Sequence, residues 1–210
     1  MRKNTFIQYF MWFSVSMVYY SVSLNIDKLI KGGDFYINST LLGLIEFPAF
    51  GLPIIFLLYF GRRLPMCGMF ILGGLSLLGT LFVPAGERMP YQVFPHNLQT
   101  LIFTGAPHII MAGLGKLGIT GAFASCYVVS AEIFPTELRQ SGLGSASMFA
   151  RLGAMLAPLI GRELSKYSSE LPILIFTTVS ISAGLLVLLL PETHNRTLPD
   201  TVEEGTRKRP

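Results

Sequence analysis

The sequence predicts an all-α polytopic membrane protein with six transmembrane helices. Hydrophobic residues make up 51% of the chain and charged residues only 13%, whereas soluble domains usually contain about 25% charged residues. Apolar runs of roughly 20 residues, the length needed to cross a bilayer as a helix, recur along the chain. Most charged residues fall in the segments between these runs, as in membrane proteins that cross the bilayer several times.

Six apolar runs are the expected spans, and they cover residues 6–24, 37–60, 64–83, 107–130, 142–161 and 171–190. The first run imitates a secretory signal peptide because Arg2 and Lys3 precede it. We favour a true span, because the run is long for a signal peptide and only Ser21-Val22-Ser23 resembles a cleavage site. Residues 1–190 are therefore one six-helix domain, and residues 191–210 are expected to form a disordered cytoplasmic tail.

The boundaries between spans follow from local chemistry. The second and third spans are separated by the tight basic turn Gly61-Arg62-Arg63. The fourth span must end before Pro135, because proline cannot donate a backbone hydrogen bond and disfavours helix at the residue before it. Pro191 ends the sixth span in the same way. Polar loops are expected over residues 25–35, 84–100 and 162–170.

Six spans place both ends of the chain on the same side of the membrane. Nine Lys and Arg residues fall on that side and five on the other, while Lys116 and Arg151 lie within spans. Loops rich in Lys and Arg stay in the cytoplasm. Both termini are therefore expected to be cytoplasmic.

Three charged residues lie inside predicted spans, where a charge costs at least about 2.5–3.5 kcal/mol. Glu46 suits a substrate-ammonium or proton site, with a structural salt bridge as the alternative. Lys116 either extends to the interface or pairs with Glu46 or another acid. Arg151 can bind a carboxylate through two hydrogen bonds, which favours a substrate or gating role.

Two helix faces accompany these charges. Small residues share the face of Arg151 at steps of three and four, namely Gly144, Ser147, Ala154 and Pro158. They leave room for a ligand, and they suit close helix packing equally well. Trp12, Tyr19 and Tyr20 lie along one side of the first span, where aromatic rings either bind organic ions or simply pack the bundle.

A second charged group is expected at the cytoplasmic rim, and it comprises Arg62, Arg63, Glu132, Glu137 and Arg139. Charge pairs there can hold neighbouring helices together in one state and release them in another, because exposed pairs contribute only about 0–1 kcal/mol. Ordinary positive-inside anchoring explains the arginines of the turn. It does not explain the two acids.

Other classes of function lack a signal. The net charge of +4 is modest and basic residues lie at helix ends, so no nucleic-acid surface is expected. Cys67 and Cys126 lie inside apolar runs, which suits buried thiols rather than a disulfide. The three histidines show no metal-ligand spacing. No nucleophile–base pair or phosphate-binding loop appears, so we expect neither an enzyme nor a cofactor or metal.

Several motifs resemble one family. The motif Glu-Ile-Phe-Pro-Thr-x-x-Arg-x-x-Gly runs from Glu132 to Gly142, and Ala150-Arg151-Leu152-Gly153 follows it. With Glu46-Phe47-Pro48-Ala49, the Gly61-Arg62-Arg63 turn and residues 190–193, the chain resembles the organic cation/anion/carnitine transporters of the major facilitator superfamily. The resemblance covers nearly the whole chain but only helices 7–12 of that family, which is one half of a major facilitator fold.

The resemblance implies a multi-pass plasma-membrane protein that moves small organic ions by alternating access. It implies substrate contacts at Trp12, Tyr19, Tyr20, Glu46, Lys116 and Arg151. It implies a cytoplasmic gate built from Gly61, Arg62, Arg63, Glu132, Pro135, Arg139 and Gly142.

Three departures from the family pattern concern substrate charge and gating. Leu58 stands where the superfamily turn usually has an acid. Phe50 stands where the anion branch commonly has a lysine, and Arg151 stands where the cation branch commonly has an aspartate. The pattern looks more like the carnitine branch, in which Glu46 and Arg151 would hold the two ends of a zwitterion.

The cavity of such transporters lies between two six-helix halves. The expected partners are therefore the lipid bilayer and either an N-terminal six-helix half or another copy of this chain. The alternative is a truncated, non-transporting membrane protein that associates with intact transporters and regulates them.

Overall fold

The computed structural model describes residues 2–24, 35–82, 106–168 and 170–193. These residues form long α-helices and no β-strand. The helices are α1 (Arg2–Leu24), α3 (Phe35–Phe60), α4 (Arg63–Phe82), α6 (Ala106–Ile133), α7 (Arg139–Glu163) and α8 (Leu171–Val187). The predicted loop over 84–100, nearly all of the loop over 25–35 and the tail beyond Thr193 lie outside the described residues.

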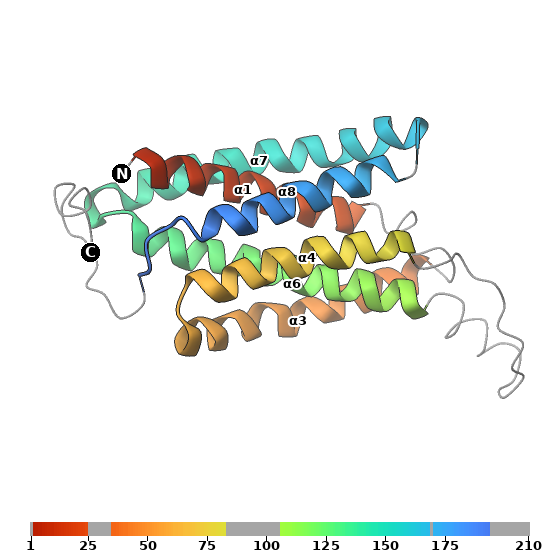
Figure 1. Ribbon diagram of the computed structural model, residues 1–210, viewed down its shortest axis with the longest axis horizontal. Coiled ribbons are helices and arrows are strands. Elements are labelled where there is room, and N and C mark those ends of the chain that lie inside the picture. Colours follow the sequence, from red (N-terminus) through yellow and green to blue (C-terminus); the bar gives the residue numbers. More distant parts are fainter. Residues whose placement is uncertain (1, 25–34, 83–105, 169, 194–210) are drawn as a thin grey trace, which may run out of the picture.

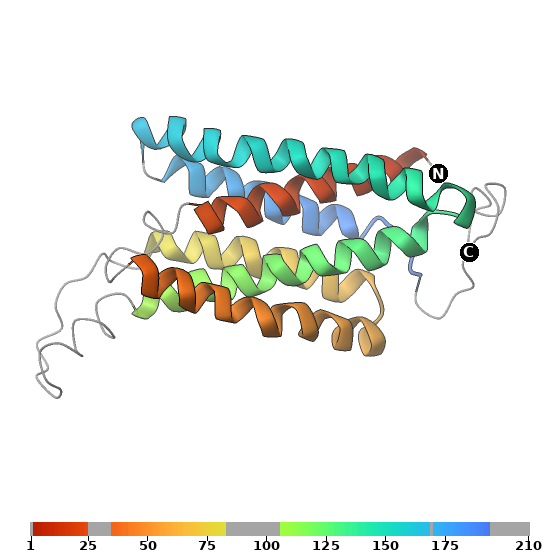
Figure 2. The same cartoon turned by 180° about the vertical axis from the view of Figure 1, so that it is seen from behind.

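The helices lie side by side in an elongated bundle (Figures 1 and 2). α1 packs mainly against α7 and also against α8 and α6, while α6 packs against α3 and α4, and α4 packs against α8. One end of the bundle carries the start of α1, the turn between α3 and α4, and the segment that follows α8. We call it the Arg62 end, and the opposite end the far end.

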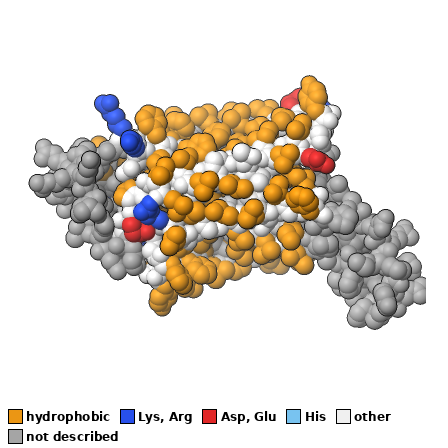
Figure 3. All heavy atoms as spheres, viewed as in Figure 1, with side chains coloured by type: hydrophobic (Ala, Val, Ile, Leu, Met, Phe, Trp, Pro, Cys, Tyr) orange, Lys and Arg blue, Asp and Glu red, His pale blue; other side chains and the backbone are white. Residues whose placement is uncertain are grey.

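The helical class predicted from the sequence is confirmed, and the number of spans remains a prediction. Four stretches are long and apolar enough to cross a membrane, and they are Ser39–Phe60, Arg63–Phe82, Ile109–Ile133 and Thr136–Lys166. α1 is long enough but more polar, and α8 is apolar but has only 17 residues. In Figure 3, hydrophobic side chains cover the surface between the two ends, and charged side chains stand at the ends.

The turn between α6 and α7 has the predicted break. α6 ends at Ile133, Pro135 has extended backbone, and a short 3-10 helix, η1 (Thr136–Leu138), leads into α7. A Cβ at Gly142 would lie 2.7 Å from the ring of Phe134, so only glycine allows this ring to pack on the first turns of α7.

The end of α7 differs from the prediction. Arg162 and Glu163 were expected in a polar loop, but α7 continues through both, and a 3-10 helix, η2 (Leu164–Lys166), follows. Lys166 donates to Glu163 at 2.6 Å, which bridges the end of α7 and η2. The polar composition indicated a surface segment correctly, and the i,i+3 spacing of Glu163 and Lys166 is one that favours helix slightly.

The packing face of α7 is formed by small residues that are all buried, namely Ala146, Ala150, Gly153, Ala157 and Gly161. A Cβ at Gly153 would overlap the backbone carbonyl oxygen of Phe13, so α1 and α7 approach closely at this point. Close packing therefore uses a different face from the one that carries Arg151. Gly144, on the Arg151 face, has nothing within 4 Å of its Cβ position.

Candidate functional site

An ion pair joins α3 and α6 within their apolar stretches. The Lys116 Nζ atom lies 2.7 Å from the Glu46 Oε1 atom. Tyr19 of α1 donates its hydroxyl proton to the same oxygen at 3.0 Å. Lys116 also donates to the hydroxyl of Ser23, and its Nζ atom lies 4.2 Å from the centre of the Tyr19 ring. The predicted alternative that Lys116 pairs with Glu46 is confirmed.

The two members of this pair differ in exposure. The side chain of Lys116 is 5% exposed and that of Glu46 is 26% exposed. A buried ammonium is tolerated only with such compensation, because charges lose their hydration on burial. Glu46 is therefore the more exposed member of the pair.

Aromatic rings extend from this pair along α1 and α6. The Tyr19 ring lies 5.8 Å from Phe123 and 5.4 Å from Tyr20, measured between ring centroids. The Trp12 ring lies 4.5 Å from Tyr127, and Phe123 lies 5.6 Å from Tyr127. Tyr20 is 41% exposed and Tyr127 is 50% exposed. We call these five residues the aromatic face.

Trp12 has a structural position within the aromatic face. It is almost fully buried, and its indole N–H donates to Ser130 at 2.8 Å. Ser130 in turn donates to Gln8 at 2.7 Å. Trp12 therefore packs α1 against α6 in this conformation, and Tyr20 and Tyr127 supply the accessible rings.

Phe123 and Tyr127 were not among the predicted site residues. The sequence does contain the pattern that places them there, because Lys116, Thr120, Phe123 and Tyr127 follow one another at steps of four, three and four along α6. Such spacing places them on one helix face.

Arg151 stands apart from the Glu46 pair. Its residue is exposed on α7, and no hydrogen bond or ion pair joins it to any residue that the structure describes. α7 runs beside α1, because Ser145 is hydrogen-bonded to Tyr9 and Gly153 packs against the backbone of Phe13. Arg151 lies between these two contacts, so it is level with the middle of α1. The structure does not bring Arg151 into contact with Glu46, so the zwitterion arrangement remains a hypothesis.

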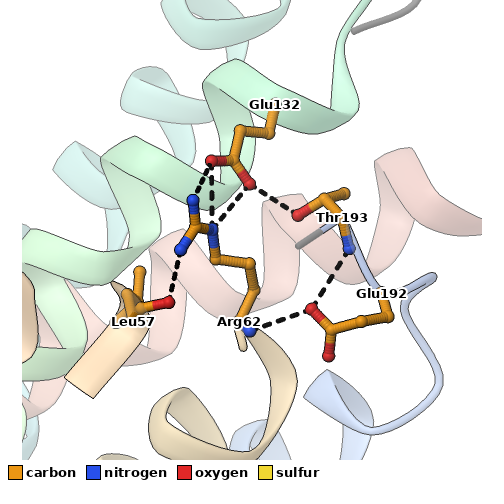
Figure 4. Close-up of polar contacts among 5 residues, drawn as sticks. All are labelled: Leu57, Arg62, Glu132, Glu192 and Thr193. Atoms are coloured by element: carbon orange, nitrogen blue, oxygen red, sulfur yellow. Dashed lines mark hydrogen bonds and ion pairs between the residues drawn. The ribbon is translucent and has the colours of Figure 1, made fainter. Parts of the chain in front are cut away.

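The second predicted group, at the Arg62 end, forms a hydrogen-bonded network (Figure 4). The Nε and Nη2 atoms of Arg62 donate to the Glu132 carboxylate at 2.8 to 3.0 Å, and Nη1 donates to the Leu57 carbonyl oxygen at 2.5 Å. The hydrogen bonds to Glu132 raise the pKa of Arg62 above its usual value. Arg62 therefore stays charged across the whole physiological range.

The segment after α8 completes the network. Glu192 accepts hydrogen bonds from the backbone N–H of Arg62 at 2.9 Å and of Arg63 at 3.3 Å. Thr193 donates its hydroxyl proton to Glu132 at 2.6 Å. Gly61 makes the preceding turn with a φ of +85°, which favours glycine. Glu192 and Thr193 were noted only as part of a motif, and the structure makes them members of the network.

The other predicted rim residues do not join this network. Glu137 and Arg139 make no ion pair with any described residue, and the Nε and Nη2 atoms of Arg139 are buried without a hydrogen-bond partner. Pro135 and Gly142 shape the α6–α7 turn. The predicted gate thus divides into one connected network around Arg62 and one structural turn around Pro135.

Comparisons with known proteins agree with the resemblance drawn from the motifs. The model of the Major Facilitator Superfamily matches residues 4–210. The chain is 39% identical over 205 residues to the organic cation transporter protein of Drosophila melanogaster, covering 98% of this chain and 34% of that protein.

Vertebrate relatives show similar coverage. Identity is 37% over 204 residues to solute carrier family 22 member 13 of Homo sapiens, covering 97% of this chain and 33% of that protein. It is also 37% over 204 residues to solute carrier family 22 member 3 of Mus musculus, covering 97% and 34%. The chain thus spans about a third of the length of these curated relatives.

Proposed function

We propose that this chain, which belongs to the Major Facilitator Superfamily, forms one six-helix wall of a plasma-membrane transporter for small organic ions. Its relatives carry the names of transporters and solute carriers rather than of enzymes. The observation that carries the proposal is the Lys116–Glu46 pair beside the aromatic face. Each charge lies seven residues, about 10 Å, inside an apolar helical stretch.

In the proposed mechanism the aromatic face holds the organic part of the substrate. Exposed rings such as Tyr20 and Tyr127 attract organic cations and stack on flat ions. A positive group on the substrate replaces Lys116 at Glu46, and a negative group pairs with Arg151. This exchange leaves the buried ammonium of Lys116 without its counter-charge, an unfavourable step that substrate binding has to offset.

A second six-helix unit is part of this proposal. Alternating access needs two units that rock against each other around a central site. The exposed rings of the aromatic face and the free guanidinium of Arg151 are the groups that such a unit would enclose. The Arg62 network would face the cytoplasm, with both termini, and would hold α3, α6 and the segment after α8 together in one of the two states.

The test is an uptake assay. The chain is expressed alone and together with a separately encoded N-terminal six-helix half of the family, and uptake of radiolabelled carnitine, of a simple organic cation and of an organic anion is measured. We expect uptake only with both halves. Uptake by the chain alone would show that two copies form the cavity. No uptake despite normal surface expression would favour the regulatory, non-transporting alternative.

Matched variants locate the site within the same assay. Glu46→Gln and Arg151→Ala should each abolish uptake per molecule at the cell surface, so uptake is divided by the amount of surface protein for every variant. Glu163→Gln and Arg162→Ala are the controls, because they make the same chemical changes at exposed positions of the far end. Equal uptake by Arg151→Ala and Arg162→Ala would remove Arg151 from the site.

A further inference from the structure

Lys116 carries a charge that a single carboxylate balances. Its side chain is 5% exposed, and its Nζ atom lies 2.7 Å from the Glu46 Oε1 atom. The other groups in contact with the ammonium, the Ser23 hydroxyl and the Tyr19 ring, carry no charge. No second ion pair of Lys116 occurs among the residues that the structure describes. The positive charge of Lys116 therefore depends on Glu46.

The helices packed around Lys116 supply no other described acid. α1, α3 and α4 make most of the contacts of α6. From α1 come Tyr19, whose hydroxyl donates to Glu46 of α3, and the neighbouring ring of Tyr20. Beside Gly115, the residue before Lys116, α4 presents only Gly73, Ser76 and Leu77. The next carboxylate described on α6 itself is Glu132, about 24 Å along the helix.

A cation that binds Glu46, as in the proposed function on which this inference rests, changes this balance. Two positive charges then share one carboxylate, and one of them is buried. Lysines buried in proteins without a counter-charge are found neutral at pH 7, and a neighbouring cation disfavours the charged form further. The neutral amine still donates to Ser23, whose own hydroxyl proton is donated to the Tyr19 carbonyl oxygen at 3.0 Å. Loss of one proton thus removes the unbalanced charge and keeps this hydrogen bond.

We propose that each organic cation bound at Glu46 releases one proton from Lys116. One N–H bond of the ammonium breaks, its electron pair stays on the Nζ atom, and the proton passes to water. The site holds one positive and one negative charge before the exchange and one of each after it, so no net charge is buried. Since the cation and this proton exclude each other, alternating access would move a cation in one direction and a proton in the other.

The exchange makes cation affinity depend on pH. The proton and the cation compete for the site, so a higher pH favours the cation-bound state. Release of one proton raises the affinity about tenfold per pH unit wherever Lys116 is charged in the free site and neutral in the complex. A site in which Lys116 keeps its proton would lack this dependence.

The test uses the full 210-residue chain in lipid nanodiscs, together with the separately encoded N-terminal half of the uptake assay. The probe is tetraethylammonium, which has no titratable proton, so any proton released on binding comes from the protein. Isothermal titration calorimetry in two buffers with different ionisation enthalpies counts the released protons. We expect about one proton per bound cation and a Kd that falls about tenfold per pH unit around neutral pH.

A substitution identifies the group that loses the proton. Lys116→Met keeps an apolar stem and has no proton to release, so this variant should bind tetraethylammonium without proton release and with a Kd that is independent of pH. Lys166→Met is the matched control, because it makes the same change in an exposed ion pair, in which Lys166 and Glu163 are 62% and 56% exposed. It should release the proton as the unsubstituted chain does.

Two results would overturn the proposal and leave the proposed function standing. One is binding without proton release, and the other is proton release that persists in Lys116→Met. Absence of binding would remove the cation site at Glu46, and with it both proposals. The proton count on the unsubstituted chain needs no variant, so it decides the question even where Lys116→Met fails to fold.

Discussion

The neighbourhoods of α3 and α6 are joined by two ion pairs of opposite polarity. Toward the far end the cation, Lys116, belongs to α6 and the anion, Glu46, belongs to α3. At the Arg62 end the anion, Glu132, belongs to α6, and the cation follows the end of α3. We call Arg62–Glu132 the outer pair and Lys116–Glu46 the inner pair. The outer pair is reinforced by hydrogen bonds from Glu192 and Thr193, which follow α8. The inner pair combines a buried cation with a partly exposed carboxylate.

The difference teaches how each pair can act. Arg62 and Glu132 share several hydrogen bonds across three segments, so the loss of one contact leaves others in place. Lys116 is enclosed, and its ammonium contacts one carboxylate oxygen, one hydroxyl and the ring of Tyr19. We therefore expect the loss of one contact in the outer network to lower the free energy of unfolding only slightly. Loss of the single contact between Lys116 and Glu46 should lower it by a large amount in one step.

The largest expected effect is at the inner pair. Glu46→Gln leaves Lys116 buried without a counter-charge, which costs about 3–5 kcal/mol. The free energy of unfolding, measured by denaturant titration of the detergent-solubilised chain, should fall by that amount. In the double variant Glu46→Gln with Lys116→Met most of the loss should be recovered, because no charge is then buried. Equal stability of the single and double variants would mean that the pair contributes no electrostatic stabilisation.

A smaller effect is expected at the outer pair. Arg62→Gln removes the hydrogen bonds to Glu132 and Leu57, but Glu132 keeps Thr193 and is partly open to solvent. Hydrogen bonds to charged groups contribute about 1.5–3 kcal/mol, so the unfolding free energy should fall within that range. Arg62→Lys should recover only part of it, because lysine cannot bind the carboxylate through a planar fork. If Arg62→Gln lowered the free energy of unfolding more than Glu46→Gln does, the outer pair would contribute more stability than the inner pair, contrary to this expectation.

The smallest effect is expected where the segment after α8 joins the network. Thr193→Val keeps the shape of the side chain and removes the hydroxyl that donates to Glu132. The expected loss of unfolding free energy is about 1.5 kcal/mol, the lower end of the range for a hydrogen bond to a charged group. Thr178→Val is the matched control, because the exposed hydroxyl of Thr178 bonds only within its own helix, to Leu174. An equal loss in both variants would show that Thr193 does not fasten this segment.

The sequence was informative wherever the chemistry of one residue decides the outcome. Pro135 fixes the end of α6 because it lacks an N–H group, and buried charges such as Glu46 and Lys116 must find partners whatever the packing. Arg62 at a helix end, with acids expected on the same rim, pointed to the outer pair. These predictions needed only the order of residues and the cost of burying charge.

The sequence was less informative wherever the result depends on how helices are placed against one another. The face of α7 through Arg151 and the face through Gly153 are both rich in small residues, and periodicity does not say which one meets α1. Glu192 caps a turn 130 residues earlier in the chain, a relation that no local pattern contains. Trp12 was predicted to contact substrate, but in the structure Ser130 and Tyr127 of α6 cover its ring.

The polar character of α1 has a consequence for the assembly of the protein in the cell. α1 buries Gln8, Ser14, Ser16 and Ser21, and it is less apolar than the four stretches that are long and apolar enough to cross a membrane. Its partners α6, α7 and α8 are synthesised more than a hundred residues later. Within this chain α1 is therefore synthesised before the helices that cover its polar side chains, and we expect its stable insertion to depend on those later helices.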